Sequence, residues 1–221
     1  SSKDFYIQLK KTKKFNLDIF GTTHSDPAHF IPELIQNADD KNANEAYFNF
    51  DTQKSIINFG HNGKNFSKND ILNIVSFGHT EKSTKIDKIG KFGTGFKSVY
   101  KVCDKPEIAC KLEGGNNQST FIKFAIENKI IPVRQNNINI NSTKEFQSFA
   151  TNFFFKLKNA EILTRENFIT FIKTNGSKIL LFLPNIRKLI FKIDDQKFSF
   201  KRHDEDKKEN LKICTIYVDT N

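Results

Sequence analysis

The sequence contains no methionine, no tryptophan and only three cysteines among its 221 residues. A chain without methionine lacks a natural start residue, so we expect it to be a fragment of a larger protein. An odd number of cysteines without metal-ligand spacing argues against a disulfide framework or a metal site. We therefore expect Cys103, Cys110 and Cys214 to be reduced thiols in a cytoplasmic protein, where they serve as small core side chains.

Long apolar runs are also missing. No stretch approaches the roughly 20 apolar residues that a membrane-spanning helix needs, and the first residues do not form a signal peptide. We therefore expect no membrane partner. Residues 1–14 are polar and rich in lysine, and we interpret them as a tag remnant or a flexible lead. The remaining length is sufficient for one good-sized core.

Acidic residues are outnumbered by basic ones, and the formal net charge is +10. A basic balance can indicate a nucleic-acid or other anionic partner. The lysines are scattered along the whole chain, however, and no recognition motif accompanies them. Any binding of nucleic acid is therefore expected to be weak and strongly dependent on salt.

Local patterns predict helices early in the chain and mainly antiparallel strands later. Asp26 is a good N-cap and Pro27 suits the first helical position, so a helix is expected over 28–40. Apolar periodicity and turn signals predict the other elements: strands over 46–51, 55–59, 107–112, 120–127, 130–133, 152–157, 178–183, 189–193, 197–201 and 211–218, and helices over 69–75, 96–102 and 165–174. This combination predicts an α+β two-layer sandwich.

One face of the first predicted helix carries polar residues beside an apolar stripe. Glu33, Asn37 and Asp40 follow one another at i, i+4 and i+7, so they share this face. A carboxylate and a carboxamide at the edge of a core are costly to bury unless they are paired. The segment alone is equally typical of a solvated amphipathic helix.

A second segment is a glycine run that leads into a predicted helix. Gly90, Gly93 and Gly95 let the backbone approach an anion closely, and the helix that follows presents free N–H groups. This arrangement is typical of a phosphate cradle. It is not a P-loop, because no Gly-Lys-Ser/Thr closes it, and its spacing does not match the dinucleotide fingerprint.

Between these segments, a predicted strand ends in the polar turn His61, Asn62 and Gly63. Alone this is an ordinary turn. In this order, however, the three segments resemble the Bergerat ATP-binding fold of gyrase, heat-shock chaperones, histidine kinases and MutL. That superfamily has Glu and then Asn four residues later on a helix, an Asp-x-Gly turn and a Gly-x-x-Gly-x-Gly run. Within the superfamily, the sequence most resembles the sacsin and No Vein type, over roughly residues 25–190. The segments that carry this resemblance are Glu-Leu-Ile-Gln-Asn-Ala-Asp-Asp and Gly-Lys-Phe-Gly-Thr-Gly-Phe-Lys-Ser-Val.

The resemblance implies a mixed, mainly antiparallel sheet covered by helices on one face, with a lid over residues 77–92. It also implies Mg²⁺ and ATP as ligands. Asn37 would coordinate Mg²⁺ through its amide oxygen, and Glu33 would act as the general base toward the attacking water. The residues implied at the phosphates are those that begin the last helix of the motif, namely Gly90, Gly93, Thr94, Gly95, Phe96 and Lys97.

For the base, the resemblance implies contacts from the polar turn and from Asp40, with Thr151 behind the adenine. The superfamily usually has Asp where this chain has His61. That carboxylate accepts a hydrogen bond from the adenine amino group. A neutral histidine can donate or accept, so the substitution leaves base recognition as the open question.

These observations predict a Mg-dependent ATP-binding domain that hydrolyses ATP slowly and uses closure of the lid as a conformational switch within a larger protein. Its partners would be ATP, neighbouring domains and a protein client. One alternative is a nucleotide-gated binding module without significant hydrolysis. Another is a DNA-associated module of the MutL or gyrase kind. The predicted boundaries are residues 15–188 for the ATP-binding domain and 189–221 for a C-terminal strand extension.

Overall fold

The computed structural model describes residues 26–75, 95–113, 121–135, 144–207 and 211–220. Their strands form one nine-stranded sheet with the order β5-β4-β3-β6-β2-β1-β7-β8-β9. The strands are β1 (Glu45–Asp51), β2 (Ile56–His61), β3 (Glu107–Lys111), β4 (Phe121–Glu127), β5 (Ile131–Arg134), β6 (Thr151–Lys156), β7 (Lys188–Ile193), β8 (Gln196–Lys207) and β9 (Leu211–Thr220).

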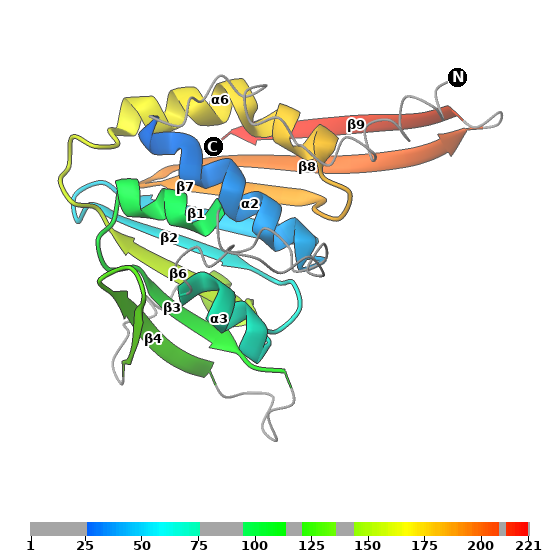
Figure 1. Cartoon of the computed structure of the whole chain (residues 1–221). Coiled ribbons are helices and arrows are strands. Elements are labelled where there is room, and N and C mark those ends of the chain that lie inside the picture. The colour runs from blue at the N-terminus through cyan, green and yellow to red at the C-terminus, as the bar shows by residue number, and fades with distance from the viewer. Residues whose placement is uncertain (1–25, 76–94, 114–120, 136–143, 208–210, 221) are drawn as a thin grey trace.

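All neighbouring strands in this sheet are antiparallel except β1 and β7, which pair in parallel. The fold is therefore α+β with a mixed, mostly antiparallel sheet, as the sequence predicted. Strands β7, β8 and β9 continue this sheet beyond β1. The ends of β8 and β9 extend past the helices as a long hairpin (Figure 1).

The helical segments are η2 (Pro27–His29), α2 (Phe30–Asp40), α3 (Lys68–Val75), η3 (Lys97–Lys101), α5 (Lys144–Ser148) and α6 (Arg165–Phe182). The predicted start of the first helix is confirmed, because Asp26 accepts a hydrogen bond from the Ala28 N–H and Pro27 occupies the first turn. Within these described residues, no helix is both long enough and apolar enough to cross a bilayer.

The main core lies between the sheet and helices α2 and α6, which run along the same face (Figure 1). Phenylalanines from neighbouring strands stack there. The Phe48 ring lies 4.4 Å from the Phe59 ring and 5.1 Å from the Phe191 ring, measured between centroids. Cys103 and Cys110 are free thiols buried in this core, whereas Cys214 is half-buried. Burial raises the pKa of Cys103 to about 11 and that of Cys110 to about 12.

A smaller apolar cluster covers part of the opposite face of the sheet. It joins Tyr47 of β1 and Ile190 of β7 to Phe146 and Phe149, which come from α5 and the residue after it. The sequence analysis did not predict α5. A Cβ atom on Gly60 would lie 2.7 Å from the Phe149 ring and 3.0 Å from the Phe146 ring, so glycine at this position makes room for the cluster.

The prediction of a strand over 178–183 is wrong. These residues form the last turns of α6, which begins at the N-cap Thr164 and continues through Gly176. The burial of this apolar run follows a helical pattern, because Ile179 and Leu180 are buried whereas Leu181 is 45% exposed. Helix α6 retains glycine because a Cβ atom on Gly176 would lie 2.7 Å from two carbons of the buried Phe200 ring.

Candidate functional site

Helix α2 is fixed in place at its C-terminal end by a buried carboxylate. Asp39 accepts hydrogen bonds from the backbone N–H of Asn185 (2.8 Å) and of Ile186 (2.9 Å), and from the Asn185 side chain (3.3 Å). Burial raises the pKa of Asp39, and these hydrogen bonds partly offset that effect. The contacts attach α2 to the loop between α6 and β7, which sets the rotation of the helix that carries Glu33 and Asn37.

Glu33 of the first motif lies directly against Gly95 of the third motif. A Cβ atom built on Gly95 would overlap a carboxylate oxygen of Glu33 and lie 3.0 Å from its Cδ atom. The Glu33 side chain is 17% exposed, and its Oε1 atom lies 3.8 Å from Nε2 of His29. The two motifs are far apart in sequence, so this approach of a carboxylate to the start of a helix is a product of the fold.

The segment after Gly95 is anchored by its own side chains. Phe96 is buried, and its ring lies 5.8 Å from the Phe153 ring of β6. The Ser98 hydroxyl donates to the carbonyl of Gly95 at 2.6 Å. Of the helix predicted over 96–102, Phe96 is α-helical, as Gly95 is, and Lys97–Lys101 form a 3-10 helix. Lys97 is partly exposed.

His61 is the last residue of β2 and is 2% exposed, so it belongs to the sheet and not to the predicted turn. Its Nδ1 atom accepts a hydrogen bond from the Gly63 N–H at 3.2 Å. Burial, and next the positive charge of Lys41, lower the pKa of His61 from 6.5 to about 3. The ring is therefore neutral at pH 7, and with Nδ1 as the acceptor its proton is on Nε2.

The turn after His61 packs against the C-terminal end of α2. A Cβ atom on Gly63 would lie 2.9 Å from the carbonyl oxygen of Lys41, and that oxygen accepts a hydrogen bond from the Lys64 N–H. The Lys41 ammonium pairs with the buried carboxylate of Asp70, which also accepts from Ser67 at the start of α3. Sequence reasoning missed this ion pair, because nothing in the local patterns connects the two segments.

Thr151 of β6 is the register partner of His61 across the β2–β6 pair. It is fully buried, and within the described part of the structure its hydroxyl oxygen has no hydrogen-bond partner. A buried hydroxyl without a partner costs about 1–3 kcal/mol, so a bound group that supplies the missing hydrogen bond would be favoured here. The structure thus brings together His61 and Thr151, which are distant in sequence.

Two other residues of the predicted site face different surroundings. Asp40 is exposed. Asn62 uses its amide oxygen to accept from the backbone N–H groups of Asn44 and Glu45, each at 3.0 Å, and its amide nitrogen donates to the Asn44 side chain at 2.6 Å. The contacts of Asn62 therefore hold the start of β1.

The remaining predicted residues are Gly90, Gly93 and Thr94, and with the lid over 77–92 they lie outside the described residues. Across the described ranges, no group of three or more His, Cys, Asp or Glu side chains is placed to hold a metal ion. Asn37 is partly exposed and lies one turn after Glu33 on α2. An amide oxygen in this position suits Mg²⁺, which needs only one or two protein ligands when phosphate supplies others.

The burial of His61 predicts that stability depends on pH. The folded state lowers the pKa of His61. The contribution of this residue to the free energy of unfolding is therefore complete above pH 6.5 and is lost as the pH falls toward 3. Between pH 6.5 and 5.0 we expect the parent to lose about 2 kcal/mol of unfolding free energy relative to His61→Gln. Denaturant unfolding of both proteins at several pH values measures this difference. An equal pH dependence in the two would contradict it.

Comparison with known proteins identifies the family of the chain. The family described as "Sacsin domain" matches residues 19–163. Human sacsin is 39% identical over 93 residues, which covers 34% of this chain and 2% of sacsin. Protein NO VEIN of Arabidopsis thaliana is 40% identical over 88 residues, which covers 38% of this chain and 3% of that protein. The ATPase morc-1 of Caenorhabditis elegans is 30% identical over 100 residues, which covers 43% of this chain and 12% of morc-1.

The chain therefore belongs to the sacsin domain family. It is an ATPase-type domain of the Bergerat kind, similar to those of sacsin and NO VEIN. The match spans only a small share of each relative, between 2% and 12% of its length. These relatives are thus far longer than the domain described here.

Proposed function

We propose that this domain binds Mg-ATP and hydrolyses it slowly as a module of a larger protein. The observation that carries the proposal is the contact between Glu33 and Gly95. The carboxylate of the first motif lies against Gly95, in the segment whose backbone N–H groups would hold the phosphates. A carboxylate in this position can hold and deprotonate a water molecule beside a terminal phosphate.

Other residues around this contact would have the remaining roles in nucleotide binding. Asn37 would hold Mg²⁺, which neutralises charge on the phosphates. The backbone N–H groups from Gly95 onward would donate to phosphate oxygens, because the first N–H groups of a helix have no partners within it. Lys97, two residues after Gly95, would add positive charge. Closure of the segment 77–92 over the nucleotide and a cytoplasmic location remain part of the proposal.

The presence of Glu33 favours hydrolysis over the alternative of a binding module that hydrolyses little. A protein that only binds nucleotide has no need of a general base, and a carboxylate near phosphates would weaken binding by repulsion. The slow rate is proposed because the domain corresponds to a small part of its relatives, and neighbouring domains would complete the catalytic state.

Mg-ATP is expected to stabilise the domain in proportion to its binding. At about 100 times the dissociation constant, the unfolding free energy should rise by about 2.7 kcal/mol. Asn37→Ala should abolish this rise, because the Mg²⁺ ligand is removed. A thermal-unfolding titration with and without Mg²⁺ measures the effect.

The matched control is Asn69→Ala, which makes the same change at an exposed position of helix α3. It should respond to Mg-ATP like the parent. If millimolar Mg-ATP does not raise the unfolding temperature of the parent, the proposed function is wrong. If both variants respond equally, Asn37 is not the metal ligand.

The base preference is expected to be modest. With Nδ1 already occupied, His61 has only an N–H donor left, which does not complement the adenine amino group as a carboxylate would. We therefore expect ATP to be preferred over GTP by only about tenfold. His61→Asp should increase this ratio, because the carboxylate accepts from adenine and repels the guanine carbonyl.

Affinities for ATP and GTP in the parent, in His61→Asp and in His61→Asn test this expectation. The Asn variant separates the effect of charge from the loss of the ring. A ratio above about a thousandfold in the parent corresponds to about 4 kcal/mol and would require a dedicated contact to the base.

A further inference from the structure

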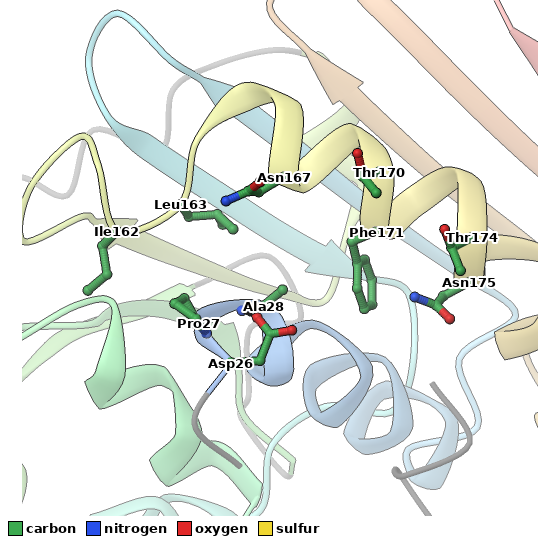
Figure 2. Close-up of a pocket in the computed structure, with 10 residues that line it drawn as sticks. All are labelled: Asp26, Pro27, Ala28, Ile162, Leu163, Asn167, Thr170, Phe171, Thr174 and Asn175. Carbon is green, nitrogen blue, oxygen red and sulfur yellow. Dashed lines mark hydrogen bonds between the residues drawn. The ribbon is translucent and has the colours of Figure 1, made fainter. Parts of the chain in front are cut away.

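A cavity of about 470 Å³ lies between the start of the first helical segment and helix α6. Its wall is formed by Asp26, Pro27 and Ala28 on one side and by residues of α6 and the preceding loop on the other (Figure 2). This volume lies within the range of small-ligand sites. None of the described residues assigned above to the nucleotide lines this cavity.

Among the described residues that line this cavity, Asp26 has the only charged side chain, and it is acidic. One oxygen of Asp26 accepts from the Ala28 N–H at 2.8 Å. Within the described part of the chain the other oxygen has no hydrogen-bond partner. The cavity is thus acidic in a chain whose net charge is +10. A ligand with a positive charge fits this lining better than an anion does.

The opposite side of the cavity carries a buried amide oxygen. Asn175 of α6 lines the cavity and is only 3% exposed, and among the described residues its amide oxygen has no hydrogen-bond partner. Figure 2 shows this side chain extending from α6 on the same side as the Phe171 ring. An unpaired buried acceptor destabilises the protein by itself, and a donor group on a ligand would satisfy it. Rotation of the amide can turn either end toward the cavity.

The rest of the wall suits an aliphatic stem. Leu163 and Phe171 are 2% and 6% exposed and give the cavity an apolar side, while Thr174 adds a hydroxyl group at the exposed face of α6. A guanidinium group offers five N–H donors in a planar arrangement, so it can serve several separated acceptors at once. An ammonium group is more compact and strongly hydrated, and it suits such a lining less well.

We propose that this cavity binds a guanidinium group on an apolar stem, namely the side chain of an arginine in a peptide segment of a partner. Asp26 would pair with the charge, Asn175 would accept a second hydrogen bond, and Leu163 and Phe171 would contact the methylene groups. The proposal does not depend on nucleotide binding.

The test uses the whole 221-residue chain and N-butylguanidinium as the probe, with the uncharged N-butylurea as its isostere. In an NMR titration, N-butylguanidinium should bind saturably and shift the side-chain amide signals of Asn175. N-butylurea should bind at least about tenfold more weakly, since the charge-assisted hydrogen bond is absent. Equal binding of the two compounds, or no saturation with the cation, would overturn the proposal.

Two variants locate the site. Asp26→Asn removes the charge but keeps a good N-cap, and it should weaken binding of N-butylguanidinium by about tenfold. Asp219→Asn removes the same charge at an exposed position of β9 and should leave the affinity unchanged. If the two variants weaken binding equally, the cation responds to overall charge and the cavity is not its site.

Asn175→Leu distinguishes a ligand site from a merely structural position. Removal of the unpaired amide should raise the unfolding temperature of the free protein, and it should weaken binding of N-butylguanidinium at the same time. Unchanged binding in this variant would show that the amide takes no part in a site.

Discussion

Replacement of Glu33 with alanine is expected to lower the rate constant for ATP hydrolysis by about 10² to 10⁴-fold. The carboxylate lies against Gly95, where the proposed phosphate site begins, and alanine cannot take a proton from water. Mg-ATP affinity should change by less than about threefold, because the metal ligand and the backbone donors remain. Single-turnover measurement of phosphate release, combined with a binding titration, separates the two quantities.

The matched control for this variant is Glu166→Ala. Glu166 is also a glutamate in the first turn of a helix, but it lies on α6 and is exposed. Its replacement should leave both hydrolysis and binding unchanged. If Glu33→Ala hydrolyses ATP at the parental rate, Glu33 is not the general base, and the module that binds without hydrolysis becomes the better description.

Gly95→Ala is expected to affect both stability and turnover. The added methyl group would overlap the Glu33 carboxylate, so either the side chain or the start of the helix must move. Overpacking of this kind costs about 1–3 kcal/mol of unfolding free energy. A displacement of about 1 Å at a general base should slow hydrolysis by about a hundredfold. Denaturant unfolding and single-turnover kinetics measure these effects.

A double-mutant cycle links the stability loss to a single contact. In a Glu33→Ala background, the nearest remaining atom is the Cβ of residue 33, which in the parent lies 3.7 Å from the new methyl group. Gly95→Ala should then be neutral, or stabilising by up to about 1 kcal/mol because alanine favours helix more than glycine. Equal destabilisation in both backgrounds would show that Gly95 is required for its backbone alone.

The parts of the fold that depend on local chemistry could be predicted from the sequence. Asp26 and Pro27 define a helix start through contacts within three residues, and the alternation of Phe48 and Phe50 with polar or aromatic neighbours indicates β1. The strand predicted over 178–183 failed because a continuous apolar run does not distinguish a strand from a helix. The Asn175-Gly176 pair also resembles a helix break, and only the Phe200 ring packed on Gly176 explains why the helix continues.

The candidate site, like the fold, could be predicted only where residue type and order are sufficient. Residue types and order pointed to Glu33, Asn37 and Gly95, since each has a chemical role that few other residues can fill. The sequence could not place the Glu33 carboxylate against Gly95, pair the hydroxyl-bearing Thr151 with His61, or show that Nδ1 of His61 is already occupied. These facts arise from strand register and helix packing, which connect distant segments. The boundary predicted at residue 189 stays a prediction.

The parallel pair of β1 and β7 has a consequence for biosynthesis. The two strands are about 140 residues apart in the chain, so a ribosome adding about 5–20 residues per second makes β7 roughly 7–30 s after β1. During that interval one edge of β1 has no partner, and its apolar side chains Phe48 and Phe50 lack the strand that will flank them. An apolar edge strand without a partner can pair with strands of other chains. The nascent domain thus passes through a period of vulnerability to aggregation that ends only when the segment 188–193 arrives.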